Sequence, residues 1–266
     1  MFNQYVKKQW HTQYLKEMAK YKSLFKVRGS LDDVNFYKTE DGYRMRTKGG
    51  VSKERIQKDP AFERTRENNK EFGSCATSGK TLRRAILDMV SNAKDSKLAS
   101  RLTQRMFKVK DQDLTSVRGQ RKVEVGIQTP EGKAWLKGFN FNRKAPLEEV
   151  LQTDFSLDTA TGEIELTDFI PTQKLYIPAG ATHVEFTSGF LNLDFATKDK
   201  DLQVSNTVNL AINGTATTVT LTPATAASGP GQSIYLLKIA FFQDINGIQY
   251  PLKNGDFNAL QIVEVL

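Results

Sequence analysis

The side chains of this chain that could do chemistry are above all cations. Between residues 44 and 122, Lys and Arg recur every few positions, and Tyr and Phe lie between the first of them. Guanidinium and ammonium groups neutralise phosphates, and aromatic rings stack on unpaired bases. The candidate contacts with a polyanion or with a neighbouring subunit are Arg44, Arg46, Lys48, Arg64, Arg66, Arg83, Arg84, Arg101 and Arg105.

One stretch, SCATSGKT at residues 74–81, is close to a phosphate-binding loop but lacks its spacing. The motif requires a glycine at the position of Ser74, and it must join a strand to a helix. Gly73 stands one residue too early, and a charged helical pattern precedes it. We interpret the stretch as a turn followed by a helix N-terminus, where Lys80, Arg83 and Arg84 could hold an anion weakly.

The sequence contains no recognisable catalytic or metal-binding pattern. The single cysteine, Cys75, excludes an intrachain disulfide, and the two histidines, His11 and His183, are far apart. Cys75 has no nearby histidine in the sequence to activate it. The carboxylates of Glu148 and Glu149 are adjacent, so in a strand they would point to opposite faces. We expect no cofactor, no metal ion and no enzymatic activity.

Charge is sorted along the chain. Residues 1–144 carry 33 Lys and Arg against 16 Asp and Glu, a net charge of +17. Residues 145–266 carry 5 against 14, a net charge of −9. Such segregation indicates two surfaces of opposite sign, which could attract each other between subunits or attract a polyanion.

The N-terminal residues predict a helix followed by a β-hairpin. Residues 1–22 have the spacing of a basic amphipathic helix. Strand-like segments follow at 24–28, 34–38 and 43–46, and Asp41-Gly42 is a strong hairpin turn. One face of this hairpin should be apolar, and we expect Lys38 on the other face with Arg44 and Arg46.

Short helices are expected after the hairpin. Asp59 and Pro60 suit the N-cap and the first position of a helix that ends at Gly73. Further helical patterns cover residues 81–93 and 96–110.

From about Arg121 onward, apolar and polar residues alternate, and turn residues separate the runs. Tight hairpins are expected at Asn213-Gly214 and Asn246-Gly247, and a flexible loop at 222–232. The predicted strands are 123–129, 135–141, 155–158, 162–169, 174–177, 183–195, 207–212, 218–223, 233–245, 248–252 and 260–266.

The sequence therefore predicts an α+β chain of two parts. Residues 1–122 form a basic N-terminal region of a helix, a β-hairpin and short helices, and residues 123–266 form an antiparallel β-sandwich with immunoglobulin-like or jelly-roll topology. No continuous apolar run is long enough for a membrane-spanning helix, and the N-terminus lacks the apolar core of a secretory signal. We expect a cytoplasmic protein, or an assembled particle released without a signal peptide.

Several stretches resemble a family of uncharacterised Bacteroidetes proteins. They are residues 25–73 with the DPAFERTREN core, RGQR at 118–121, PAGATHVEF at 178–186 and NGIQYPLKNGDFNALQIV at 246–263. The resemblance implies a basic N-terminal segment followed by an all-β C-terminal part. It implies no activity and no site residue.

The function expected from these patterns is structural. A basic region that contacts the acidic sandwich of a neighbour would build a tube, filament, shell or phage-like particle, and residues 22–46 could add a strand to a neighbour's sheet. The alternative is a nucleic-acid-binding protein of a mobile element or nucleoid that uses residues 44–122. A third class is a ligand-binding sandwich with Trp135, Tyr176 and Phe190 as a stacking platform.

Overall fold

A computed structural model describes residues 26–252 and 256–266, so the helix expected over 1–22 lies outside the described residues. The chain divides into two compact units, which we call the N-terminal unit (residues 1–62) and the C-terminal unit (residues 63–266). The boundary expected at 122/123 falls inside the second unit. The reason is that helical residues such as Leu82 and Leu102 share one hydrophobic core with strand residues such as Leu191.

The N-terminal unit contains the predicted hairpin as part of a three-stranded antiparallel sheet, β1-β2-β3. The hairpin is confirmed, but Gly42 pairs with Thr39, so the turn residues are Glu40 and Asp41, one position earlier than the expected Asp41-Gly42. Lys38 lies opposite Tyr43 on the face of Phe36, not beside Arg44 as expected, because side chains alternate along a strand. The elements are β1 (Gly29–Leu31), β2 (Val34–Thr39), β3 (Gly42–Thr47), α1 (Lys53–Lys58) and a short 3-10 helix, η1 (Pro60–Phe62).

The longest helix is α2 (Glu63–Ala85), and it corrects two expectations. It does not end at Gly73, and the stretch 74–81 is neither a loop nor a helix start but the middle of a helix. Gly73 keeps a helical backbone, and its carbonyl accepts a hydrogen bond of 2.8 Å from the Thr77 hydroxyl. A glycine inside a helix costs about 1 kcal/mol, which the buried side of α2 outweighs.

Six further helices belong to the C-terminal unit. The helix expected over 96–110 is confirmed, and its Leu102 and Met106 are buried. The strands expected at 123–129 and 135–141 are wrong. Residues 123–126 form helix α5, and residues 135 and 136 are the end of helix α6. Thr129 caps α6 through a 3.0 Å bond from the Gly132 N–H. The helices are α3 (Leu87–Ser91), α4 (Leu98–Lys110), α5 (Val123–Gly126), α6 (Pro130–Leu136), α7 (Leu147–Val150) and α8 (Pro171–Lys174).

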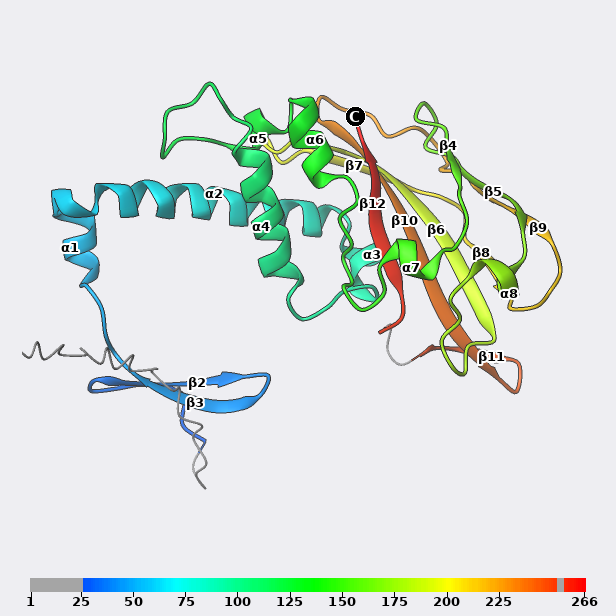
Figure 1. Cartoon of the computed structure of the whole chain (residues 1–266), viewed down its shortest axis with the longest axis horizontal. Coiled ribbons are helices and arrows are strands. Elements are labelled where there is room, and N and C mark those ends of the chain that lie inside the picture. Colours follow the sequence, from blue (N-terminus) through cyan, green and yellow to red (C-terminus); the bar gives the residue numbers. More distant parts are fainter. Residues whose placement is uncertain (1–25, 253–255) are drawn as a thin grey trace, which may run out of the picture. The chain divides into compact units, whose positions relative to one another are not determined.

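The described strands of the C-terminal unit form two antiparallel sheets (Figure 1). In the larger sheet, β10 pairs with β6 on one side and with β11 and β12 on the other, and β6 also pairs with β7 and β8. Its strands are β6 (His183–Leu193), β7 (Lys200–Val204), β8 (Val208–Ala211), β10 (Gln232–Ile245), β11 (Ile248–Pro251) and β12 (Ala259–Val265). The smaller sheet contains β4 (Ser156–Leu157), β5 (Ile164–Phe169) and β9 (Thr217–Leu221).

The larger sheet is buried on both faces. Ile234 and Leu236 of β10 pack in the core with the helices, and Tyr235 and Leu237 pack in a second core with Leu166 of β5. The mixed α+β class and the large antiparallel sheet are confirmed, and the sheet curls into a half-barrel (Figure 1). The immunoglobulin-like or jelly-roll sandwich is not confirmed, because helices α2–α6 occupy one face of the sheet.

Two hairpins have the same turn. The sequences LDTATGE (157–163) and LDFATKD (193–199) are 36 positions apart. In each, the Asp side chain (Asp158 or Asp194) accepts hydrogen bonds from the backbone N–H two residues on and from the Thr hydroxyl three residues on. The fifth turn position has positive φ, 80° at Gly162 and 71° at Lys198. The second turn leads directly into β7, which begins at Lys200.

The two Asn-Gly pairs differ. Asn246 and Gly247 form the predicted tight hairpin, with φ of 55° and 81°, between β10 and β11. Asn213-Gly214 instead joins β8 and β9, which belong to different sheets. The segment 222–232, expected to be a flexible loop, is held by bonds from Ser228 N–H to Asp201 (2.8 Å) and from Gly231 N–H to Asn192 (2.9 Å). None of the helices in the described part of the chain has the length and apolar composition that crossing a bilayer requires.

Two glycine substitutions test the course of α2 and the packing of α5 against α4. Gly73→Ala should stabilise the protein by about 0.5–1 kcal/mol, because a Cβ at Gly73 meets nothing within 4 Å and alanine favours a helix. Gly126→Ala should destabilise it by more than about 2 kcal/mol, because its Cβ would lie 2.0 Å from the Val109 carbonyl oxygen. Urea unfolding measures both. A loss of stability in Gly73→Ala would indicate that the helix ends there.

Candidate functional site

The nine candidate cations fall into three groups by element. Strand β3 and the residue after it carry one group, α2 the second and α4 the third. The groups are Arg44, Arg46 and Lys48; Arg64, Arg66, Arg83 and Arg84; and Arg101 and Arg105.

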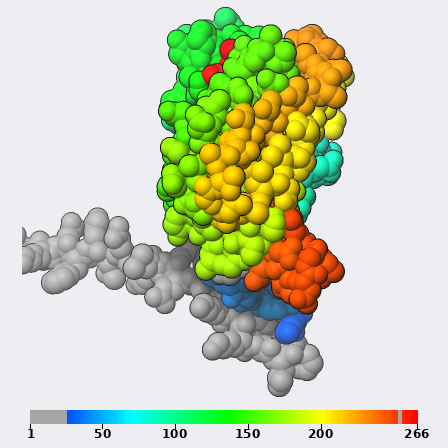
Figure 2. All heavy atoms as spheres, turned by 90° about the vertical axis from the view of Figure 1, so that its right-hand side faces the viewer, coloured from blue at the N-terminus to red at the C-terminus, as the bar shows by residue number. Residues whose placement is uncertain are grey.

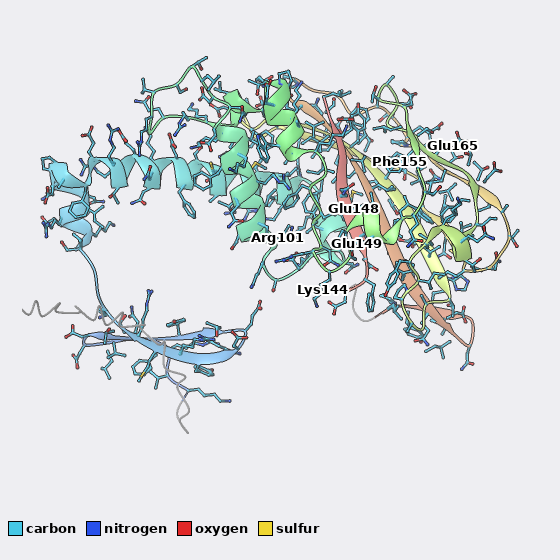
Figure 3. All side chains as sticks on the ribbon, viewed as in Figure 1. Arg101, Lys144, Glu148, Glu149, Phe155 and Glu165 are labelled. Carbon is cyan, nitrogen blue, oxygen red and sulfur yellow. The ribbon has the colours of Figure 1, made fainter. Side chains whose placement is uncertain are left out.

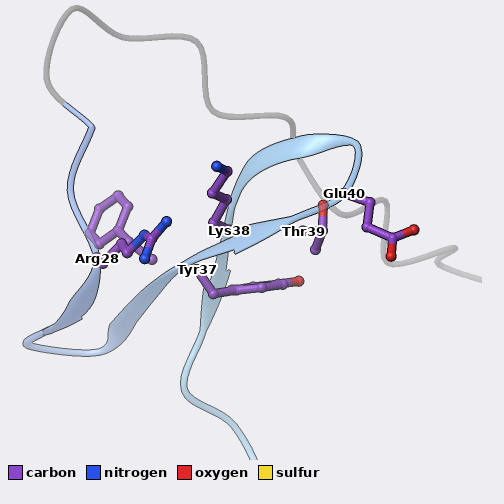
Figure 4. Close-up of a pocket in the computed structure, with 6 residues that line it drawn as sticks. Arg28, Tyr37, Lys38, Thr39 and Glu40 are labelled. Atoms are coloured by element: carbon purple, nitrogen blue, oxygen red, sulfur yellow. The ribbon is translucent and has the colours of Figure 1, made fainter. Parts of the chain in front are cut away.

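The first group surrounds an aromatic ring. Arg44 lies directly opposite Tyr37 in the β2–β3 ladder, and the Arg46 guanidinium lies 5.7 Å from the centre of the Tyr37 ring. Arg44 also pairs with Asp41 at 3.1 Å, and Lys48 Nζ donates to the Asp32 carbonyl oxygen at 2.6 Å. A shallow hollow of about 730 Å³ lies on this sheet and includes Tyr37 (Figure 4). An aromatic ring between guanidinium groups is an arrangement that can stack on a flat ligand.

The α2 group stabilises the helix that carries it. Arg64 Nη1 lies 2.9 Å from a carboxylate oxygen of Glu67, one turn further along. Arg83 and Arg84 lie in the last turn of α2, where a positive charge interacts favourably with the helix dipole. These residues do not surround a phosphate-binding loop, because α2 continues through that stretch.

In the third group, Arg101 is a structural clamp. Its Nη1 donates to the Asn140 carbonyl oxygen (2.8 Å), its Nη2 donates to that of Phe141 (3.0 Å), and it pairs with Asp95. The guanidinium groups of Arg101 and Arg105 lie 5.2 and 5.8 Å from the Phe139 ring centre. Burial, and to a smaller extent the charge of Arg101, lowers the pKa of Arg105. Arg101 therefore ties α4 to residues 139–141 rather than reaching outward.

Two further cations, Lys110 and Arg121, belong to a buried ion cluster that the sequence did not predict. The Glu71 carboxylate is 4% exposed and accepts bonds from Lys110 Nζ (2.7 Å), the Gly119 N–H (2.7 Å) and Arg121 Nε (3.1 Å). Burial raises the pKa of Glu71, but these three donors outweigh it and lower the pKa to about 2. The partners are 39 to 50 positions apart in sequence, so no local pattern could have revealed the cluster.

Cys75 is not a nucleophile in this fold. It lies in the interior of α2 and is fully buried, instead of standing at a helix start where its pKa would fall. Burial raises the pKa of its thiol to about 11. In the part of the chain that the structure describes, no group of three or more His, Cys, Asp and Glu residues is placed to hold a metal ion.

The three aromatic residues of the expected stacking platform are not brought together. Phe190 is buried and stacks on Tyr235 at 4.6 Å. Trp135 lies on α6 beneath Lys108, whose Nζ is 5.5 Å from the ring centre. Tyr176 is the most open of the three, with 61% of its surface exposed.

The structure does bring together cations that the sequence separates. Lys97, at the start of α4, and Arg143 and Lys144, more than 40 positions later, line one cavity of about 480 Å³ beside Arg101. Lys144 also borders a smaller cavity of about 230 Å³ that contains Tyr176 and Glu149. Figure 3 shows Arg101, Lys144 and Glu149 near one another between α4 and α7. No spacing in the sequence predicts this convergence.

Replacing Glu71 tests the buried cluster. Glu71→Gln should cost about 3 kcal/mol at pH 7, because the pKa of Glu71 falls from 4.5 to about 2 on folding. A carboxyl group whose pKa is lower in the folded than in the unfolded chain stabilises the fold at pH values above its unfolded pKa. For Glu71 this stabilisation disappears as the pH falls from about 4.5 to 2. The wild type and the variant should therefore become equally stable near pH 2 in urea unfolding. The matched control is Glu63→Gln at the exposed start of α2, which should cost less than about 1 kcal/mol at any pH. A constant difference between wild type and Glu71→Gln across this range would contradict the assignment.

The cations of the chain thus have two kinds of surroundings. Those of α2, Arg101 and the Glu71 cluster hold the fold. Arg28 and Lys38 of the N-terminal unit and Lys97, Arg143 and Lys144 of the C-terminal unit instead line hollows. No protein-family model, curated protein or solved structure matches the chain.

Proposed function

We propose that the protein is a non-enzymatic structural protein that self-associates into a larger assembly such as a tube, filament, shell or phage-like particle. The observation that carries the proposal is that no residue between 26 and 62 is buried, although these residues form a three-stranded sheet. A small sheet needs a buried apolar face for stability. We infer that a neighbouring copy provides the surface that covers it.

One face of the N-terminal sheet has the side chains for such a contact. Leu31, 64% exposed, lies opposite Val34, and Met45, 38% exposed, lies opposite Phe36. Cations stand beside these groups: Lys38 lies opposite Tyr43 in the ladder. A complementary partner surface would be apolar at its centre and acidic at its rim.

The C-terminal unit offers acidic surface. Its residues 63–144 carry 19 Lys and Arg against 9 Asp and Glu, a net charge of +10, and residues 145–266 have a net charge of −9. Among the described residues, two ion pairs join these parts, Lys137–Glu264 and Lys144–Asp256. Exposed carboxylates such as Asp154 and Asp168 therefore carry negative charge that these two pairs do not neutralise.

Several of these carboxylates lie on the side of the smaller sheet. The strands β4, β5 and β9 of the smaller sheet lie on the face shown in Figure 2. Asp154, Asp158 and Asp168 are exposed on or beside β4 and β5. If the N-terminal unit of one copy binds this face of the next, the contact is heterologous. Heterologous contacts propagate into filaments or close into rings.

The sheet of the C-terminal unit also has an open edge. Among the described residues, β11 pairs with β10 alone, and Ile245, Ile248 and Tyr250 on this hairpin are each about half exposed. An edge of this kind can accept a strand from another chain. This supports an assembly in which part of residues 22–46 is added to a neighbour.

The second candidate is a nucleic-acid-binding protein that uses the basic region 44–122. It is favoured by the Tyr37 ring beside Arg44 and Arg46, which suits stacking on an unpaired base. It is weakened by the internal engagement of Arg64, Arg101 and Arg121.

Substitutions on the two faces of the N-terminal sheet test self-association. Leu31→Asp with Met45→Asp should convert the assembly into monomers, because two charges would enter an apolar contact. The matched control places the same charges on the opposite face, as Asn35→Asp with Thr39→Asp, and should assemble like the wild type. Sedimentation velocity and negative-stain images give the sizes. A wild-type protein that remains monomeric at low salt and high concentration would refute the proposal.

Salt and nuclease distinguish the two candidates. Particles held by the acidic and basic surfaces of neighbouring copies should persist after nuclease treatment and dissociate as NaCl rises to about 1 M, where charge interactions are screened within about 3 Å. Copurified nucleic acid that is lost steeply with salt, together with particles that vanish after nuclease treatment, would favour the second candidate.

A further inference from the structure

Four cations line one cavity of the C-terminal unit. Lys97 directly precedes α4, Arg101 lies in its first turn, and Arg143 and Lys144 come from the loop before α7. Its other lining residues are Asp95, Ser96, Ser100 and Gln104, so the wall carries four positive charges, one carboxylate and neutral hydrogen-bonding groups. The volume of about 480 Å³ falls within the range of ligand-binding cavities.

The single carboxylate of this wall is already neutralised. Asp95 pairs with Arg101 and accepts hydrogen bonds from the backbone N–H groups of Lys97 (2.7 Å) and Arg143 (2.9 Å). These bonds use both carboxylate oxygens and hold the start of α4 against the loop that carries Arg143. Asp95 therefore positions the wall, and the charge left for a ligand is that of Lys97, Arg143 and Lys144.

Lys144 is only loosely held in place. It pairs with Asp256 at 3.1 Å, but the two side chains are 63% and 55% exposed. Ion pairs at such exposure contribute little to stability. Lys144 can therefore turn toward an anion in the cavity at small cost.

An aromatic slot adjoins the cationic cavity. This second hollow, of about 230 Å³, is lined by Tyr176, Pro178, Phe241 and Phe257 together with Ala145 and Val150. Lys144 and Glu149 are its charged residues, and Lys144 is shared with the cationic cavity. Tyr176 exposes an aromatic surface on which a flat group could stack.

We propose that the two hollows form one binding site for a nucleotide, with the phosphate among Lys97, Arg143 and Lys144 and the base in the slot beside Tyr176. A phosphate requires several cations at one point, and a base stacks on aromatic rings. Glu149 at the slot can accept a hydrogen bond from an amino group of the base. The nucleotide is either free or a residue of a single-stranded nucleic acid. The site lies entirely in the C-terminal unit, so it does not depend on self-association.

Isothermal titration of the full chain with AMP, inorganic phosphate and adenosine tests the proposal. AMP should bind at least about tenfold more tightly than either fragment, because one stacked base contributes a factor of that order. A second titration with a 5′-phosphorylated oligoadenylate shows whether the nucleotide is free or belongs to a single-stranded nucleic acid. Tighter binding of AMP indicates a free nucleotide, and tighter binding of the oligonucleotide indicates a residue of a nucleic acid.

Variants separate the two halves of the site. Lys97→Gln with Arg143→Gln should weaken AMP and inorganic phosphate about tenfold or more and leave adenosine unchanged. Tyr176→Ala should weaken AMP and adenosine about tenfold and leave phosphate unchanged. The matched control, Lys70→Gln with Lys80→Gln on exposed parts of α2, removes the same charge elsewhere and should bind AMP like the wild type.

Three results would overturn the inference: no binding of AMP or the oligonucleotide at millimolar concentration, equal binding of AMP and inorganic phosphate, or an equal loss of AMP binding in the control pair. Thermal unfolding of each variant establishes that it is folded. A monomeric protein that binds AMP would refute the proposed assembly but support this site. An assembled protein that does not bind AMP would support the assembly but refute this site.

Discussion

The C-terminal unit depends on one strand that is buried on both faces. Alternate side chains of β10 enter different cores, Ile234 and Leu236 on the side of the helices and Tyr235 and Leu237 on the side of the smaller sheet. Side-chain alternation makes this possible, and it also fixes the register, because a shift by one residue would exchange the two sets. β10 pairs with β6 over eleven residues, from Gln232 to Phe242. Every layer of the unit is therefore placed relative to this strand.

This constraint explains what the sequence could and could not predict. Strands with clear alternation or strong turns, such as 183–195 and the hairpin at Asn246-Gly247, are confirmed because their local pattern agrees with the fold. Residues 123–129 alternate as well, but residues 123–126 form helix α5, whose Gly126 lies against Val109 of α4, and Thr129 caps the next helix, α6. Gly73 suggested a helix end, yet the buried side of α2 continues past it. Where tertiary packing opposed the local sequence pattern, the packing determined the secondary structure.

The charge segregation has a different meaning in the structure. Residues 1–62 carry 14 Lys and Arg against 7 Asp and Glu, a net charge of +7, so much of the basic charge belongs to the C-terminal unit. There, the Glu71 cluster and the Arg101 clamp use cations to hold α4 and the loops around it. Contacts of this kind join residues about 40 to 50 positions apart, which is why a count of charges along the chain could not separate structural cations from available ones.

The Asp95–Arg101 pair connects the fold to the candidate site. Arg101 binds the carbonyl oxygens of Asn140 and Phe141, and the same segment pairs with β12 through the bond from Phe141 N–H to the Leu260 carbonyl oxygen (2.8 Å). Asp95 binds the Arg143 N–H, so the loop that presents Arg143 and Lys144 is fixed from the edge of the sheet to the start of α4. A cationic cavity built in this way exists before any ligand arrives, and little ordering is required on binding. The sheet of the N-terminal unit has no buried residue among those described, so we propose that it gains its order from a contact with a neighbouring copy. The proposed binding and the proposed assembly therefore use different parts of the chain.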